Sequence, residues 1–378
     1  MDLLSMQTIE ERLQVVNELI PDFQKRAAAN DQQGRFPFEN IRDLKEIQYT
    51  RLTSPKEFGG GNISLYDFVR LQEAIAIGDG ATALSIGWHM GAMMNLSENR
   101  PWGNELFTFV CQEVSKGALL NVCATEEQTG SPTRGGRPGT TAVQEGNKWI
   151  ISGRKSFATM SQMLDFFIVS ATIESTDEVA FFLIPSDSKG ISIEETWDSI
   201  AMRSSGSHDL ILDHVEIPFD YLTEKQTTRK KGAQGYLLHI PACYLGVAEA
   251  AKREAVSFAK SYTPNSLAHP IFELPAIQQK VGEIELKLMQ SRHFLYSVAK
   301  MWDDSSIERR NQMAPELSAV KLSVTNLAVE IVDLAMRIVG ARSLSAKSPL
   351  QRFYRDVRAG LHNPPMDDMT LMLLAKRV

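Results

Sequence analysis

The stretch FFIVSATIESTDEVAFFLI, residues 166–184, contains two short runs that are rich in β-branched and aromatic residues. Similar runs occur at residues 149–151 and 210–215. Turn-forming residues separate these runs, as is typical of strands joined by short turns. No long helical pattern lies between them, so a sheet built from parallel strand–helix–strand units is not expected. We therefore predict that residues 120–226 form a central domain, an antiparallel β-barrel or sandwich.

Helical patterns flank this domain on both sides. Residues 1–119 are predicted to form an N-terminal helical domain, in which Thr8 and Glu11 match a capping box and Ser64 can cap a later helix. Residues 227–378 are predicted to form a C-terminal four-helix bundle, because short connections between long helices indicate antiparallel neighbours. The fold class is therefore α+β with several domains. The apolar residues that recur at helical spacing in the bundle lie within 240–262, 275–302 and 313–339.

The composition is that of a globular protein with a mildly acidic balance. The 378 residues are 43% hydrophobic and carry a net charge of −6. No nucleic-acid or membrane partner is expected, because such proteins normally carry an excess of Lys and Arg. The least polar stretch, residues 81–97, is shorter than the roughly 20 residues of a membrane helix and is interpreted as a buried helix. The first ten residues lack the features of a secretory signal, and three scattered cysteines fit a reducing compartment, so we expect a cytoplasmic protein.

Several common catalytic motifs are absent from the sequence. There is no G-x-G-x-x-G after a strand, so a Rossmann dinucleotide site is not supported. There is no G-x-x-x-x-G-K-[ST], so a P-loop is not supported either. H-E-x-x-H and G-x-S-x-G are also missing. The seven histidines are scattered, and no Glu-x-x-His pair is present for a di-iron site, so no metal is expected.

Six segments of the chain follow one another in an order and spacing that indicate a single family. They are Ser54–Gly60, Ala124–Ser131, Gly153–Thr159, Ala201–Ser205 with Leu212–Pro218, Gly246–Ala251 and Arg352–Asp356. Together they resemble motifs of the acyl-CoA dehydrogenases, such as P-E-x-x-G-G, T-E-P-x-A-G-S and G-x-K-x-W-I-T. The resemblance spans about residues 5–375. It implies the same order of helical, β and helical domains that the residue patterns predict independently.

The resemblance implies a flavin enzyme that desaturates an acyl-CoA thioester in fatty acid metabolism. The expected cofactor is FAD, with FMN as the alternative, and the expected partners are an acyl-CoA or other small-molecule substrate and an electron-transfer flavoprotein or flavin reductase. A homotetramer is also implied. Hydroxyl groups near a flavin can tune the reduced ring, and Phe157 keeps an aromatic ring where the family has Trp. The residues that match the flavin segments are Ala124, Thr125, Gly130, Ser131, Phe157, Ala158 and Thr159.

The sequence departs from the family at the catalytic base. Dehydrogenases usually carry a Glu nine residues after the Arg of the R-D motif, and here that count from Arg355 reaches Pro364. The other known base position, within residues 235–239, also lacks a carboxylate. A general base must lie within hydrogen-bond reach of its proton, so we name His362 as the candidate.

Further departures resemble a side branch of the family, the flavin-dependent monooxygenases of the dibenzothiophene monooxygenase type. Residues 261–272 contain no Arg to contact a flavin diphosphate, which favours FMN, although Arg337 or Arg342 could replace it. Ser131 and His89 are candidate substrate contacts. Three functions therefore remain open: acyl-CoA desaturation, monooxygenation or N-hydroxylation with reduced flavin and O2, and binding of flavin or acyl-CoA without turnover.

Overall fold

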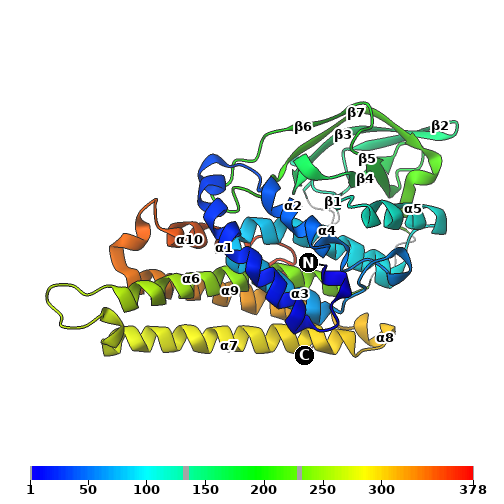
Figure 1. Ribbon diagram of the computed structural model, residues 1–378. Coiled ribbons are helices and arrows are strands. Elements are labelled where there is room, and N and C mark those ends of the chain that lie inside the picture. Colours follow the sequence, from blue (N-terminus) through cyan, green and yellow to red (C-terminus); the bar gives the residue numbers. More distant parts are fainter. Residues whose placement is uncertain (1, 131–135, 228–231, 378) are drawn as a thin grey trace.

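The computed structural model describes residues 2–130, 136–227 and 232–377, and its N-terminal part is helical (Figure 1). Thr8 and Glu11 form the predicted capping box at the start of the first helix, and the Ser64 hydroxyl accepts a hydrogen bond from the Asp67 N–H. Both predicted caps are confirmed. The helices are α1 (Ile9–Gln33), α2 (Phe38–Glu46), α3 (Leu65–Gly78), α4 (Gly80–Asn99) and α5 (Asn104–Ser115).

The central part is a sheet of short and medium strands. Its strand order is β6-β7-β3-β2-β4-β5-β8, with β1 paired to β4. Strand β4 is buried along its whole length, which explains why its sequence is apolar without alternation. The strands are β1 (Leu120–Cys123), β2 (Thr141–Glu145), β3 (Lys148–Ala158), β4 (Phe166–Ile173), β5 (Val179–Pro185), β6 (Ile191–Glu194), β7 (His208–Pro218) and β8 (Leu222–Lys225).

The prediction of an antiparallel barrel or sandwich is wrong in two respects. The sheet is open, since β6 and β8 stand at its two ends, and it is mixed, since β4 runs parallel to β1 and to β2. The physical reason is that the chain reverses twice between β1 and β4, once at the β2–β3 turn and once after β3. A hairpin therefore serves as the crossover that a helix provides in most parallel sheets.

The C-terminal helices form a long bundle whose far end projects beyond the rest of the molecule (Figure 1). The predicted segments correspond to α6 (His239–Ser261), α7 (Pro275–Asp303) and α9 (Ala314–Val339), and a short α8 (Ile307–Arg310) precedes α9. Helices α10 (Pro349–Ala359) and α11 (Asp367–Ala375) complete the chain. Helix α10 was not predicted as an element, although Ser348 caps it and Pro349 begins it.

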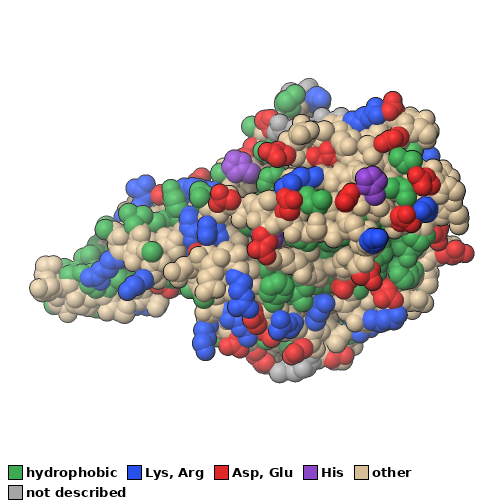
Figure 2. All heavy atoms as spheres, turned by 90° about the horizontal axis from the view of Figure 1, so that it is seen from above, with side chains coloured by type: hydrophobic (Ala, Val, Ile, Leu, Met, Phe, Trp, Pro, Cys, Tyr) green, Lys and Arg blue, Asp and Glu red, His purple; other side chains and the backbone are tan. Residues whose placement is uncertain are grey.

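Buried charges join the N-terminal helices to the bundle. Arg292 of α7 contacts Glu73 of α3 (2.7 Å) and Glu249 of α6 (2.9 Å), and both carboxylates are nearly inaccessible to solvent. On the outside, acidic and basic side chains are mixed over the face in Figure 2. Across the described part of the chain, no helix has the length and apolar character that a membrane crossing requires.

Candidate functional site

The end of β3 presents an aromatic ring to solvent. The pairing of β3 with β7 shifts register between Lys155 and Ala158, and such a bulge turns a side chain to a new direction. Phe157 lies in this bulge with φ +60°, which is unusual for a bulky residue, and 60% of it is exposed. Its ring contacts Trp197 edge to face, with centroids 5.9 Å apart. Strained backbone that exposes a large apolar ring is typical of a ligand site.

A chain of hydroxyl groups lies directly behind Phe157. Thr159 Oγ1 is 3.0 Å from Ser207 Oγ, which in turn is 2.7 Å from Ser205 Oγ. The Thr159 carbonyl accepts a hydrogen bond from the Asn121 amide (3.1 Å), and Ala158 is fully buried. Thr159 is therefore held in place by the loop before β7.

The segment after β1 lies beside β3. The Ser156 N–H donates to the Thr125 carbonyl (2.8 Å), while Glu126 and Gly130 exchange two backbone hydrogen bonds. Gly130 has φ +73°, a conformation that favours glycine. The Thr125 hydroxyl has no hydrogen-bond partner within the described residues, and the Ala124 carbonyl accepts a long bond from Ser170 (3.4 Å). Ser131, predicted to contact both flavin and substrate, lies outside the described residues.

A buried ion pair fixes this segment to β3, and the sequence reasoning missed it. Lys155 Nζ lies 2.5 Å from Glu126 Oε1, and the Glu126 carboxylate also accepts hydrogen bonds from Thr140, Thr129 and the Gly139 N–H. Burial by itself would raise the pKa of Glu126, but the hydrogen bonds from Lys155 and Thr140 outweigh it and lower the pKa to about 2. The signal was present, since both residues belong to the quoted motifs, but their contact joins positions 29 apart in the chain.

The loop between α10 and α11 lies on the bundle side. Asn363 Oδ1 accepts a hydrogen bond from the Tyr244 hydroxyl (2.5 Å). Asp367 accepts from Lys321 (3.2 Å) and Asn326 (3.0 Å), so its carboxylate is engaged with α9. His362 is exposed, and only its backbone N–H forms a hydrogen bond, to Ala359, within the described structure. This loop therefore offers an amide and an imidazole where a dehydrogenase needs a carboxylate.

His89 is enclosed between α4 and β1. Its Nε2 lies 3.0 Å from the Thr50 carbonyl, and its Nδ1 accepts a hydrogen bond from the Leu120 N–H (3.1 Å). Burial lowers the pKa of His89 to about 4, so the ring is neutral at pH 7. Because both nitrogens are occupied by backbone groups, His89 as placed has neither a free donor nor a free acceptor for a substrate.

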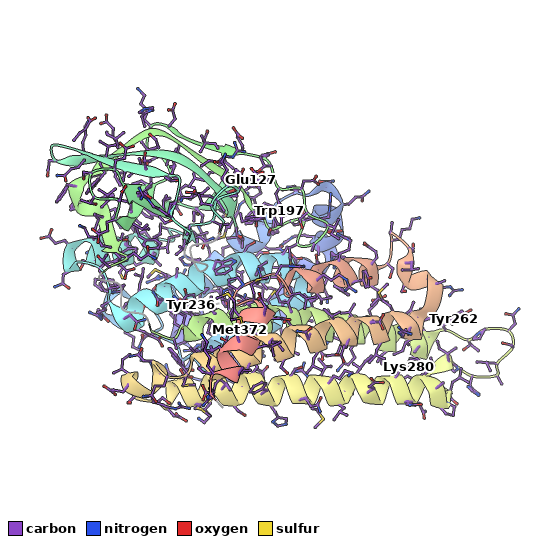
Figure 3. All side chains as sticks on the ribbon, turned by 180° about the vertical axis from the view of Figure 1, so that it is seen from behind. Glu127, Trp197, Tyr236, Tyr262, Lys280 and Met372 are labelled. Atoms are coloured by element: carbon purple, nitrogen blue, oxygen red, sulfur yellow. The ribbon has the colours of Figure 1, made fainter. Side chains whose placement is uncertain are left out.

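Aromatic rings fill the space between α4 and α6. His239 stacks on Phe68 and meets the edge of Trp88, and both of its ring nitrogens lack a hydrogen-bond partner among the described residues. Burial lowers the pKa of His239 to about 3. Tyr236 lies against Gly91, where any Cβ would clash with its ring. In Figure 3, Trp197 and Glu127 lie on the sheet side of the candidate site and Tyr236 and Met372 on the helical side.

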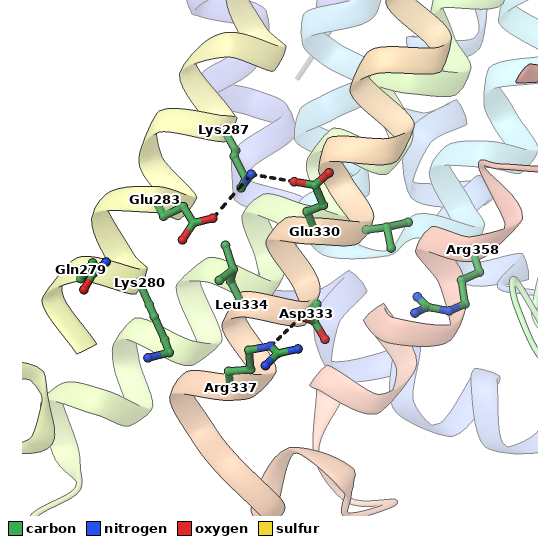
Figure 4. Close-up of a pocket in the computed structure, with 10 residues that line it drawn as sticks. Gln279, Lys280, Glu283, Lys287, Glu330, Asp333, Leu334, Arg337 and Arg358 are labelled. Carbon is green, nitrogen blue, oxygen red and sulfur yellow. Dashed lines mark hydrogen bonds and ion pairs between the residues drawn. The ribbon is translucent and has the colours of Figure 1, made fainter. Parts of the chain in front are cut away.

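A separate groove contains one of the arginines that could bind a diphosphate. Arg337 lies with Lys280, Lys287 and Arg358 in a groove of about 600 Å³ between α7, α9 and α10 (Figure 4). Arg337 already pairs with Asp333 (2.7 Å). The other candidate, Arg342, lies over the ring of Tyr262, 4.3 Å from its centroid. Both arginines are thus engaged within the chain.

Comparisons with known proteins agree on one family. The chain matches the acyl-CoA dehydrogenase N-terminal domain over residues 11–100, the middle domain over 121–215 and the C-terminal domain over 238–377. It is 53% identical over 364 residues to "Putative acyl-CoA dehydrogenase YdbM" of Bacillus subtilis, covering 96% of this chain and 95% of that protein.

More distant relatives are named for other activities. L-Evernosamine nitrososynthase of a Micromonospora species is 26% identical, with 90% of this chain and 83% of that protein covered. The structure of KijD3 with FMN and a dTDP-amino-keto sugar superposes with a TM-score of 0.84 at 26% identity, covering 96% of this chain and 92% of that one. The flavin expected from the sequence is consistent with these relatives.

Proposed function

Because the chain belongs to the acyl-CoA dehydrogenase family, we propose that it is a flavin-dependent oxidoreductase of the monooxygenase type. One observation carries this choice. The loop after α10 presents Asn363, whose amide is bonded to Tyr244, and the nearby Asp367 is bonded to Lys321 and Asn326. Removal of an acyl α-proton requires a base within hydrogen-bond reach, and residues 360–366 of this loop contain no Asp or Glu. Asp368, which follows Asp367 in α11, is exposed and accepts a hydrogen bond from the Met369 N–H (2.8 Å).

The residues around Phe157 fit a flavin. An exposed aromatic ring can cover a planar heterocycle. The Thr125 hydroxyl, which has no partner among the described residues, and the Thr159 hydroxyl can bond to its polar edge. Gly130, with its positive φ, allows close approach of a ligand to the backbone, and Ala124 lies in the same segment, whereas Ala158 is fully buried and can only support the site from behind. A reduced flavin bound there supplies the electrons that activate O2.

FMN is the proposed form of the flavin. The segment 261–272 has no Arg, and Arg337 and Arg342 are held by Asp333 and by Tyr262. A second phosphate would therefore find few free cations at these positions. The FMN in the KijD3 complex supports this choice, and the nitrososynthase relative supports oxygen transfer to a small amine or similar substrate. A flavin reductase is the proposed partner.

Acyl-CoA desaturation is the second candidate, and it is supported by the 53% identity to a Bacillus subtilis protein named as an acyl-CoA dehydrogenase. In that case His362 would have to remove the α-proton. Its imidazole is exposed, and histidine is the side chain that most often acts as a general base in enzymes.

Two assays separate these functions. The protein is reconstituted with FMN or FAD, and acyl-CoAs of different chain length are added without oxygen. We expect no bleaching of the flavin. With a flavin reductase, NADH and ¹⁸O2, we expect ¹⁸O in a product when amines or organosulfur compounds are supplied. Anaerobic bleaching by an acyl-CoA would replace the first proposal by the second, and a His362→Ala variant should then bleach about 100-fold more slowly.

A further inference from the structure

A cleft of about 1280 Å³ lies between α1, α6 and the start of α10. None of the candidate flavin residues lines it. Its walls combine apolar side chains such as Ile20, Pro21 and Phe353 with several charged ones. This volume is large enough for a small organic ligand, since such sites typically measure about 300–1,000 Å³.

Arg352 lines this cleft and forms no hydrogen bond or ion pair with a described residue. Only 6% of the residue is exposed, yet its guanidinium has no hydrogen bond or ion pair to any described residue. It lies over the ring of Phe353, 5.1 Å from the centroid. The nearby Asp356 directs its carboxylate to the Met202 N–H (2.7 Å). The charge of Arg352 favours the ionised form of Asp356, but no hydrogen bond or ion pair to a described residue occupies the guanidinium, so it can pair with an anion that enters the cleft.

Other arginines around the cleft are paired, which sets Arg352 apart. Arg355, on the same helix, contacts both Asp31 (2.5 Å) and the Ile200 carbonyl (2.6 Å). Arg253 of α6 contacts Glu249 (2.9 Å). Each of these side chains forms an ion pair with a carboxylate, whereas Arg352 forms none with a described residue.

The start of α10 adds a second attraction for anions. Ser348 caps this 11-residue helix and Pro349 begins it, so the positive end of the helix dipole lies at the cleft wall. Lys347, just before the cap, is exposed and adds a cation. Of the two carboxylates in the wall, Asp31 is paired with Arg355, and Glu254 alone opposes the positive charge.

We propose that this cleft binds an organic anion whose phosphate or carboxylate group pairs with Arg352 near the start of α10. The apolar part of the ligand contacts Ile20, Pro21 and Phe353. The proposal does not depend on the flavin, because the cleft shares no residue with the candidate flavin site.

Calorimetric titration of the full-length protein tests this proposal with three probes of equal chain length: octyl phosphate, octanoate and octan-1-ol. We expect at least one of the two anions to bind and the alcohol to bind at least about 10-fold more weakly. Arg352→Gln should weaken anion binding by about 10-fold or more, the usual effect of losing a charge-assisted hydrogen bond. Arg253→Gln is the matched control and should change it less than about 3-fold, since its charge is already paired.

Two further variants distinguish a loss of binding from a folding defect. Arg352→Lys keeps the charge and should bind more tightly than Arg352→Gln. Ser257→Trp, at an exposed position of α6 in the cleft wall, should block binding while the circular dichroism spectrum stays unchanged. The proposal is overturned if neither anion binds the wild-type protein at millimolar concentration, or if Arg352→Gln or Ser257→Trp binds as tightly as the wild type.

Discussion

Asp356 is the residue whose ionisation should affect stability most visibly. Burial raises the pKa of Asp356 to about 7, even though its carboxylate accepts a hydrogen bond from the Met202 N–H. The folded protein therefore holds a proton that the unfolded chain, with a pKa near 3.8, releases. The contribution of Asp356 to the free energy of unfolding should be greatest below about pH 4 and should decrease as the pH rises through about 7, by at most ~4 kcal/mol.

Asp356→Asn tests this sign. Asparagine keeps the acceptor for Met202 and carries no charge, so the variant should lose less stability than the wild type between pH 4 and pH 8. Urea unfolding at several pH values measures the difference. Asp304→Asn, at an exposed position, is the control and should follow the wild-type profile. Parallel curves for Asp356→Asn and wild type would show that Asp356 titrates normally.

Phe157 should matter for flavin binding and little for folding. Its ring is mostly exposed, so Phe157→Ala should change the unfolding free energy by no more than about 0.5 kcal/mol. Loss of a stacking partner worth about 0.5–1.5 kcal/mol should weaken FMN binding about 2- to 10-fold, as measured by fluorescence titration. Ile200→Ala removes another exposed apolar side chain of the same domain and should leave both quantities unchanged. Equal FMN affinity in the two variants would contradict this role.

At the scale of elements, the crossing of α3 and α6 depends on Gly246. A Cβ at this position would lie 2.6 Å from the Ala76 Cβ and closer still to the Glu73 carbonyl. Gly246→Ala should therefore force the helices apart and cost about 1–3 kcal/mol of unfolding free energy. Gly282→Ala is the matched control on α7, where a Cβ meets nothing within 4 Å, and should stabilise by about 0.5–1 kcal/mol. Denaturant unfolding of both variants checks the contrast, and equal effects would refute it.

The elements that the sequence predicts well are those with local signals. The capping box of Thr8 and Glu11 and the Ser64 cap depend on residues three apart, and the structure forms both. The strands were recognised from composition, but their pairing was not. The direction of β4 relative to β1 depends on the path of the chain through β2 and β3, and no local sequence pattern predicts that path.

In the candidate site, too, features with a local sequence signal were predicted and contacts between distant residues were not. The motif residues Thr125, Phe157 and Thr159 come together around the end of β3, as the resemblance implies, though their contact with a flavin stays a prediction. The sequence could not predict the Glu126–Lys155 ion pair or the absence of an ion pair at Arg352 among the described residues. Both depend on which side chains, distant in the sequence, come into contact when the chain folds. The same holds for His89, whose two nitrogens meet backbone groups from residues 50 and 120.

At the scale of the whole molecule, the outer face of α7 supports the proposed homotetramer. Leu286 and Met289 are each 55% exposed and lie three residues apart, so they share one face of the helix. An apolar pair on a long bundle helix can be covered by a second copy of the chain.

Light scattering of the wild type should give a mass close to four times the 42.2 kDa of one chain. The double variant Leu286→Glu with Met289→Glu should reduce that mass to a dimer or monomer, because two carboxylates would be buried without partners at the interface. Lys300→Glu, exposed on the same helix, is the control and should keep the wild-type mass. A wild-type protein that is monomeric at micromolar concentration would exclude the tetramer, and an unchanged mass in the double variant would place the interface on another face.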